Sequence, residues 1–307
     1  MKNRLIGQEL REKGAKALFL LAALFSAGAL LVITVFLFMN GVPFIAKCGF
    51  GNFVFGTRWD IVADNPSYGI LPMIVTTLYV TALSVLIGVT VGVLTAVFLY
   101  RFCPSRLVSP IRQLINILAG IPSVIYGLIG VTVLIPFVRR FLSPNGVGHG
   151  IFTASIVLAV MILPTVVSVT LDSLNAVPEN YYEGALALGA TPEEATFRIM
   201  LPAAKSGIMA GIVLATGRAI GETMAVIMVI GGSPEMPHSL FQSVRTLTSN
   251  IAMGAMELKD EPLQALIASG VVLFVFALLL NVSFSLLKSG KKEKGKGRRK
   301  SHAKTGR

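Results

Sequence analysis

The sequence predicts an all-α membrane protein with six transmembrane helices. Of the 307 residues, 54% are hydrophobic and only 14% are charged, and the mean hydropathy is +0.75. Few soluble domains are this apolar. The apolar residues gather in six stretches, each close to the ~20 residues that one bilayer crossing needs, with polar segments between them. Both observations indicate a chain that crosses a membrane repeatedly.

The first apolar stretch covers residues 17–39 and follows a short basic segment at residues 1–16. Its apolar core is longer than that of a signal peptide, and no small-residue cleavage site follows, so we expect a retained helix. The next segment, residues 40–69, predicts an external loop. The rings of Trp59 and Tyr68 in this loop suit the membrane interface.

The second, third and fourth spans are predicted at residues 71–100, 114–138 and 151–171. Pro122 interrupts the third span, where it removes a helical hydrogen bond and predicts a kink. The fourth span contains Pro164. A short loop before the third span carries three arginines: Arg101, Arg106 and Arg112.

A polar, amphipathic segment at residues 178–202 separates the fourth span from the fifth, at residues 203–232. It predicts two short helices lying off the membrane. Pro178 suits the first position of the first helix, because its missing N–H has no helical partner there. Gly189 is expected to end this helix, since glycine tolerates the left-handed cap position.

The second short helix has a clear start signal. Thr191 precedes Pro192, and Glu194 follows three residues after Thr191, which is the spacing of a capping box. The pair Leu201-Pro202 predicts its end.

The polar segment at residues 233–262 predicts a short surface helix at residues 239–258, before the sixth span at residues 263–287. A basic tail at residues 288–307 follows. Ten of the 27 Lys and Arg lie in this tail. A basic cluster after an apolar helix indicates a cytoplasmic end near anionic lipid rather than a nucleic-acid site.

Lys and Arg also predict the orientation. With six spans, both termini, the loop before the third span and the segment 178–202 share one side. That side carries 20 of the 27 Lys and Arg, against 6 on the other side. Both termini and the segment 178–202 are therefore expected in the cytoplasm.

The fifth span carries a charged pair. Arg218 lies thirteen residues after Lys205, roughly 20 Å along a helix and near mid-membrane, where a charge costs ~2.5–3.5 kcal/mol. Glu222 is in the i,i+4 position and is expected to pair with it. The pair is either a structural lock or part of a substrate path. In the second case, the planar guanidinium suits an oxyanion, and Glu222 accepting from a P–OH group would favour phosphate over sulfate.

The two cysteines do not predict a disulfide or a metal site. Cys48 and Cys103 are expected on opposite sides of the membrane, and their spacing fits no metal site. Two G-x-x-x-G pairs in the fifth span let helices approach closely, either within the chain or between subunits. These pairs are Gly207 with Gly211 and Gly217 with Gly221.

The segment 178–202 resembles the EAA loop of ABC importer permeases, with the spacing E-A-A, three residues, G, nine residues, I-x-L-P. Gly184 replaces the first alanine and keeps the position small. The matching residues are Glu183, Gly184, Ala185, Gly189, Ile199, Leu201 and Pro202. In that family the loop fits a groove on the ATPase subunit, so the resemblance implies a coupling hairpin. The alternative is a surface hairpin with no partner.

Residues 59–287 are similar to the PstC-type permease subunit of phosphate ABC importers. The similar segments are YGILP, IPSVIYGL, GRAIGETMAVIMVIGG and SLFQSVRTLTSNIA. The resemblance implies a type I importer (MetI-like) fold. Its core at residues 70–287 has five transmembrane helices, and residues 17–39 form a peripheral helix. Arg218 and Glu222 fall on the charged pair of the family's fifth span.

The same resemblance implies partners in the plasma (inner) membrane and on both of its sides. These are a PstA-type permease, two PstB-type ATPase subunits that bind ATP and magnesium, and an extracytoplasmic PstS-type phosphate-binding protein. The outer segment 233–262 meets the binding protein in the family, or it only caps its own bundle. No cofactor is expected in this chain, and GALALGAT lacks the lysine of a phosphate-binding loop. We therefore expect a transport subunit rather than an enzyme.

Several alternatives stay open. The substrate could be another oxyanion, molybdate or sulfate. The chain could be the sister PstA-type subunit, although TMAVIMVIGG after Glu222 favours the PstC type. A secondary carrier would explain the broken helices but not the hairpin. A membrane enzyme would need clustered His, Cys or carboxylates, and the three histidines are scattered at His149, His238 and His302.

Overall fold

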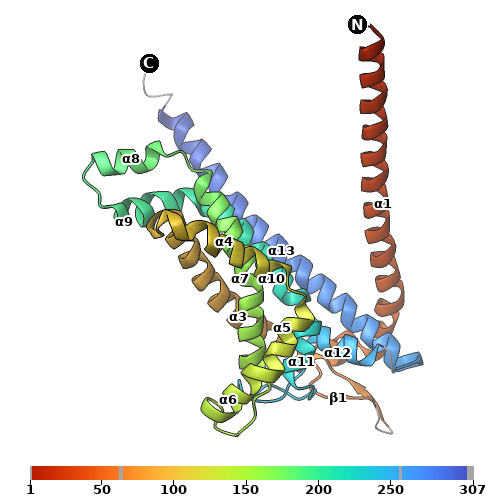
Figure 1. Cartoon of the computed structure of the whole chain (residues 1–307). Coiled ribbons are helices and arrows are strands. Elements are labelled where there is room, and N and C mark those ends of the chain that lie inside the picture. Colours follow the sequence, from red (N-terminus) through yellow and green to blue (C-terminus); the bar gives the residue numbers. More distant parts are fainter. Residues whose placement is uncertain (1, 62–64, 256–257, 303–307) are drawn as a thin grey trace.

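The structure, a computed structural model, describes residues 2–61, 65–255 and 258–302; for residues 2–11, 13 and 284–302 it describes the backbone alone. Within these ranges the chain is almost entirely helical (Figure 1). Six helices are long and apolar enough to cross a membrane, which confirms the predicted fold class. They are Gly14–Cys48, Leu71–Phe102, Ser123–Phe141, Ile151–Asn175, Pro192–Gly221 and Asp260–Ser283.

The elements follow in chain order, with π-helical turns labelled η. They are α1 (Lys2–Cys48), α2 (Phe50–Phe55), β1 (Trp59–Asp60), β2 (Ser67–Tyr68), α3 (Leu71–Val97), η1 (Phe98–Phe102), α4 (Ser105–Gly120), α5 (Ser123–Ile129), η2 (Gly130–Leu134), α6 (Ile135–Phe141), α7 (Ile151–Asn175), α8 (Asn180–Ala187), α9 (Pro192–Glu194), η3 (Ala195–Met200), α10 (Leu201–Gly221), α11 (Met224–Ile230), α12 (Leu247–Gly254) and α13 (Asp260–His302).

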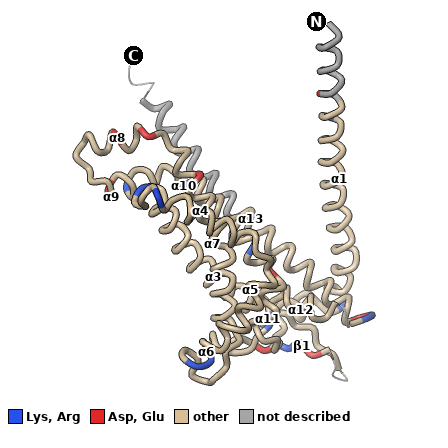
Figure 2. Tube along the Cα trace, in the orientation of Figure 1, with Lys and Arg blue, Asp and Glu red and all other residues tan. Residues whose placement is uncertain are grey.

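The helices run between two ends of the molecule (Figure 1). The hairpin of α8 and α9 lies at one end, together with the start of α1 and the far end of α13, while α6, α12 and β1 lie at the other. Figure 2 shows Lys, Arg, Asp and Glu mostly near these two ends. α1 stands apart from the bundle over most of its length and packs mainly on α13, where Phe38 meets the edge of Phe274.

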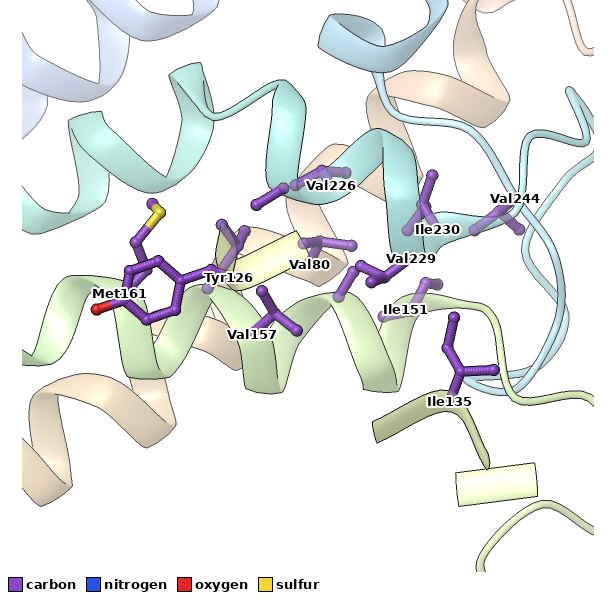
Figure 3. Packing of buried hydrophobic residues seen from close by; sticks show 13 residues of the cluster. Val80, Tyr126, Ile135, Ile151, Val157, Met161, Val226, Val229, Ile230 and Val244 are labelled. Carbon is purple, nitrogen blue, oxygen red and sulfur yellow. The ribbon is translucent and has the colours of Figure 1, made fainter. Parts of the chain in front are cut away.

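The centre of the bundle is the packing of α3 on α7, which small residues make possible. A Cβ atom added at Gly88 would lie 2.8 Å from Ile162, and one added at Gly92 would lie 2.8 Å from Val166. α5 and α11 complete the core on the side away from the hairpin (Figure 3). There Tyr126, Val157, Met161, Val226 and Val229 are buried together.

The predicted external loop at residues 40–69 is more ordered than expected. α1 continues to Cys48, α2 follows, and β1 pairs antiparallel with β2, with Trp59 opposite Tyr68. The rings of Trp59 and Tyr68 are buried within the protein. They are 6% and 8% exposed, because the strand pair folds them against Phe44 and against Leu266 of α13.

The third span also differs from its prediction. Arg106 and Arg112 lie on α4 rather than in a loop, and the chain breaks at Ile121 and Pro122 instead of kinking. Ile121 is extended, with φ −71° and ψ 127°, as a residue before proline prefers. The membrane-crossing helix therefore starts at Ser123.

The first G-x-x-x-G pair packs within the chain. A Cβ atom at Gly207 would overlap the side chain of Ser173, and one at Gly211 would lie 2.8 Å from Val169. Both neighbours belong to α7. The short outer helix, α12, covers only Leu247–Gly254 of the predicted residues 239–258. The basic tail at residues 288–307 and His302 lie outside the residues whose side chains are described.

Candidate functional site

The α8–α9 hairpin begins and turns as local sequence chemistry dictates. α8 starts at Asn180, two residues after Pro178, whose carbonyl accepts a hydrogen bond from the Tyr181 amide at 3.1 Å. Pro178 is therefore not the first helical residue that the sequence predicted. Gly189 follows the helix with φ +89°, a left-handed conformation that glycine adopts without strain.

The capping box at Thr191 is confirmed. The Glu194 amide donates to the Thr191 hydroxyl at 3.2 Å, and the Thr191 amide donates to the Glu194 carboxylate at 3.3 Å. Two amides at the helix start are satisfied in this way, which fixes where α9 begins.

The tip of the hairpin presents apolar side chains to its surroundings. Leu188 is 91% exposed, and Leu186 and Tyr181 are exposed as well. Glu183, Gly184 and Gly189 lie on the same exposed tip. Exposed apolar groups on a polar hairpin are typical of a surface that another protein covers.

The other side of the hairpin is anchored to the bundle. Tyr182 is buried, and the guanidinium carbon of Arg101 lies 3.6 Å from the centroid of its ring. Arg101 also forms an ion pair with Glu179 at 2.8 Å. The local sequence does not predict this contact, because Glu179 lies 78 residues after Arg101. Ala185 and Leu201 pack on the same core around Tyr182.

The prediction that Leu201-Pro202 ends the second short helix is wrong. The helix runs on from Pro192 to Gly221. Its turn at Ala195–Met200 is π-helical, and the Leu201 amide donates to the Thr196 carbonyl, five residues earlier. The wider turn leaves room for the ring of Pro202 and for its missing N–H. Ile199 and Pro202 are exposed on this continuous helix.

The predicted i,i+4 pair of Arg218 and Glu222 is also wrong. α10 ends at Gly221, and Glu222 is extended, with φ −68° and ψ 130°. Its carboxylate accepts a hydrogen bond from the Ala225 amide at 3.1 Å and so caps the start of α11. The ion pairs among the described residues join Lys47 to Glu261, Arg58 to Asp60, Arg101 to Glu179 and Arg198 to Glu194.

Arg218 is exposed on the surface of this chain, although it lies near the end of a membrane-crossing helix. The small residues Gly217 and Gly221 flank it. Gly221 has no neighbour within 4 Å of an added Cβ atom, and Gly217 only reaches Asn281 at 4.0 Å. A lipid-facing arginine is costly, so this face suits a second protein chain or water.

Threonines tie the break at Glu222 to the outer segment. The Thr248 hydroxyl donates to the Glu222 carbonyl at 3.0 Å and lies 3.1 Å from the Thr246 hydroxyl. The Thr77 hydroxyl accepts from the Leu247 amide at 3.0 Å. Sequence reasoning missed these residues, since nothing in their local pattern sets them apart. Among the described residues, no group of three or more His, Cys, Asp and Glu is placed to hold a metal ion.

Comparison with known proteins identifies the family to which the chain belongs. Residues 88–291 match the family described as "Binding-protein-dependent transport system inner membrane component". The chain is 36% identical to the probable ABC transporter permease protein YqgH of Bacillus subtilis, over 93% of each chain. It is 36% identical to the phosphate transport system permease protein PstC of Mesorhizobium japonicum, over 81% of each. It is 34% identical to PstC of Haemophilus influenzae, over 92% of this chain and 94% of the relative.

Solved structures agree on the fold. The inward-facing methionine ABC transporter MetNI aligns with a TM-score of 0.59 and 19% identity, over 72% of this chain and 95% of that one. A bacterial ABC transporter for the acidic polysaccharide alginate aligns with a TM-score of 0.59 and 17% identity, over 86% and 95%. The chain therefore belongs to the family of inner-membrane components of binding-protein-dependent transport systems, as a multi-pass ABC importer permease and not an enzyme.

Proposed function

We propose that this permease carries inorganic phosphate into the cell as the PstC-type half of the translocation path. The observation that carries the proposal is Arg218, an exposed guanidinium on a membrane-crossing helix with none of the described ion pairs joining it to a carboxylate. An uncompensated arginine at that depth suits a passing oxyanion. The PstC relatives, two of them at 34% and 36% identity, support phosphate as that oxyanion.

Glu222 supplies a reason for selectivity. One of its oxygens accepts from the Ala225 amide, which leaves the carboxylate with capacity for a further donor. Phosphate still carries a P–OH group at neutral pH, whereas sulfate carries none. The Glu222 carboxylate therefore accepts a hydrogen bond from a passing phosphate and repels sulfate.

The α8–α9 hairpin is the proposed contact with the ATPase. Its exposed tip around Leu188 lies against the groove of a PstB-type subunit, which binds ATP and magnesium. Glu183, Gly184, Ala185 and Gly189 belong to this contact, and Ile199, Leu201 and Pro202 continue it into α10. The start of α1 and the far end of α13 share the hairpin's end of the molecule (Figure 1), and we propose that this end lies in the cytoplasm. A PstA-type permease completes the path, and a PstS-type binding protein docks at the far end.

The test is ATP-driven uptake by the complex of this chain with its partner subunits, reconstituted in vesicles with the binding protein. Phosphate uptake is expected, together with loss of uptake in Arg218→Gln. The control Arg139→Gln removes an arginine of α6, at the far end of the bundle, and should behave as wild type. Uptake of sulfate or molybdate instead of phosphate, or wild-type uptake by Arg218→Gln, would contradict the proposal.

A second measurement tests the hairpin alone. A cysteine at Ala185 is expected to cross-link to the ATPase subunit and to be labelled only from the cytoplasmic side. The control is a cysteine at Gly146, in the loop after α6, which should be labelled from the opposite side. Labelling of position 185 from outside would show that the proposed orientation is inverted.

A further inference from the structure

A cavity of about 280 Å³ lies at the end of the molecule opposite the α8–α9 hairpin, beside β1, α12 and the start of α13 (Figure 1). Two polar side chains line it, Arg245 and Asn250. Its apolar wall includes Trp59, Met253, Leu258 and Leu266. None of these residues belongs to the path at Arg218.

Arg245 is partly buried and held in a fixed position. Its Nε and Nη2 atoms donate to the Gly232 carbonyl at 2.9 and 2.6 Å, and Nη1 donates to the Asn250 side-chain oxygen at 3.0 Å. A guanidinium group has more N–H donors than these bonds use, so one remains on each terminal nitrogen. Burial lowers the pKa of Arg245, because the site removes water from the charge.

Asn250 is 1% exposed and has a donor to spare. Its side-chain oxygen accepts from Arg245, which fixes the orientation of the amide. The amide nitrogen Nδ2 is buried and has no hydrogen-bond partner in the described part of the chain. A buried donor without an acceptor is rare in folded proteins and is often a place where a ligand or ion belongs.

Two carboxylates of the surrounding elements, those of Asp60 and Glu261, are engaged elsewhere. Asp60, next to Trp59 on β1, pairs with Arg58 at 3.0 Å. Glu261, at the start of α13, pairs with Lys47 at 2.9 Å. Within the described residues, no ion pair includes Arg245. Among the described residues the positive charge at the cavity therefore has no ion-pair partner, which leaves it available to an anion.

We propose that this cavity binds a small oxyanion through Arg245 and Asn250 and serves as an outer waiting site for phosphate before it reaches Arg218. The identity of the anion and the direction of travel rest on the proposed function. The site is connected to the path, because Thr248, in the first turn of the helix that carries Asn250, donates to the Glu222 carbonyl. An anion in the cavity would thus contact the same short helix that holds the Glu222 carbonyl.

Trp59 makes the site directly observable, since it is the chain's only tryptophan and lines the cavity. The full-length chain in lipid nanodiscs is titrated with inorganic phosphate at constant ionic strength, and Trp59 emission is recorded. A saturable change is expected. The key variant is Asn250→Asp, which keeps an oxygen for Arg245 but replaces the free amide by a negative charge. It should weaken phosphate binding by at least about tenfold, through loss of a donor and added repulsion.

The matched control is Arg58→Gln, which removes an exposed arginine beside Trp59 but outside the cavity. It should titrate as the wild type does, and so should Arg218→Gln. Thermal unfolding of Asn250→Asp checks that the variant is folded. Three outcomes would overturn the proposal. They are phosphate binding by Asn250→Asp as tight as that of the wild type, a saturable change with acetate in place of phosphate, and no saturable change in the wild type.

Uptake separates this proposal from the transport function. If phosphate is transported and Asn250→Asp needs about tenfold more phosphate for half-maximal uptake, both stand. If phosphate is transported and Asn250→Asp matches the wild type at every concentration, the waiting site is wrong and the transport function stands. If the complex does not transport phosphate, the proposed function and the waiting role fail together, while the Trp59 titration still reports whether the cavity binds the anion.

Discussion

Arg101, at the end of the second span, stacks on Tyr182 of the α8–α9 hairpin, with 3.6 Å between the guanidinium carbon and the ring centroid. The contact fastens the hairpin to η1, which continues α3, because Tyr182 is buried and Glu179 holds the same guanidinium. The Tyr182 ring is therefore a central contact between the hairpin and the bundle.

Tyr182→Ala is expected to uncouple ATP hydrolysis from uptake. Loss of the buried ring costs about 3–5 kcal/mol locally, enough to let the hairpin move without the bundle. Tyr182→Phe keeps the ring under Arg101 and should retain coupling. The measurement is uptake per ATP hydrolysed by the reconstituted complex. An unchanged ratio in Tyr182→Ala would show that the hairpin is held in another way.

Gly184 and Gly189 provide a matched pair on the same hairpin. A Cβ atom added at either position meets nothing within 4 Å, so only the backbone differs. Gly184 is helical, where alanine is better by about 1 kcal/mol. Gly189 has φ +89°, where a Cβ costs about 1–2 kcal/mol.

Gly184→Ala should therefore preserve ATPase stimulation by the loaded binding protein, and Gly189→Ala should reduce it. Limited proteolysis of the hairpin gives a second reading, with faster cleavage expected only in Gly189→Ala. Equal effects of the two substitutions would mean that the left-handed turn is not needed for coupling.

Glu222 has a structural role and a proposed chemical role, and two substitutions separate them. Glu222→Gln keeps an oxygen to accept from the Ala225 amide, so the start of α11 is preserved while the charge is lost. Its thermal stability should match the wild type, and its preference for phosphate over sulfate should fall. Glu222→Ala should lose about 1 kcal/mol of stability as well. A Glu222→Gln variant with undiminished phosphate preference would remove the carboxylate from the selectivity mechanism.

Thr76 and Thr77 are neighbours on α3, and replacing each by valine is expected to have opposite effects on stability. The Thr77 hydroxyl donates to Met73 and accepts from the Leu247 amide, so Thr77→Val leaves a buried amide unsatisfied and should cost about 1–3 kcal/mol. The buried Thr76 hydroxyl has no hydrogen-bond partner among the described residues, so Thr76→Val should be neutral or stabilising. The check is the melting temperature of each variant in detergent. Equal melting temperatures would show that the contact from α3 to α12 contributes little.

The features that the sequence predicts best are local. The capping box at Thr191 and the left-handed Gly189 depend on a few neighbouring residues, and both are found as expected. The six spans follow from apolar length alone. The even number of spans predicts that both ends share a side, and the start of α1 and the far end of α13 lie at the same end of the molecule (Figure 1).

The features that the sequence predicts poorly depend on residues far away along the chain. Glu222 leaves the helix because Thr248, 26 residues later, holds its carbonyl. Trp59 is buried because a strand pair places it near Leu266 of α13. Pro202 is tolerated in a helix only because the preceding turn is π-helical. The secondary-structure propensity of neighbouring residues gives no information about these distant contacts. Each prediction therefore followed from local sequence and missed the effect of tertiary packing.

The uninterrupted helix from Pro192 to Gly221 links the hairpin to Arg218, so a tilt at one end displaces the other. From Pro192 to Arg218 it is about 39 Å long at ~1.5 Å per residue. A tilt of about 5° at the hairpin would move the guanidinium by about 3 Å, the length of one hydrogen bond. A small displacement of the hairpin is thus large enough, at the other end of this helix, to make or break a hydrogen bond between Arg218 and the proposed phosphate.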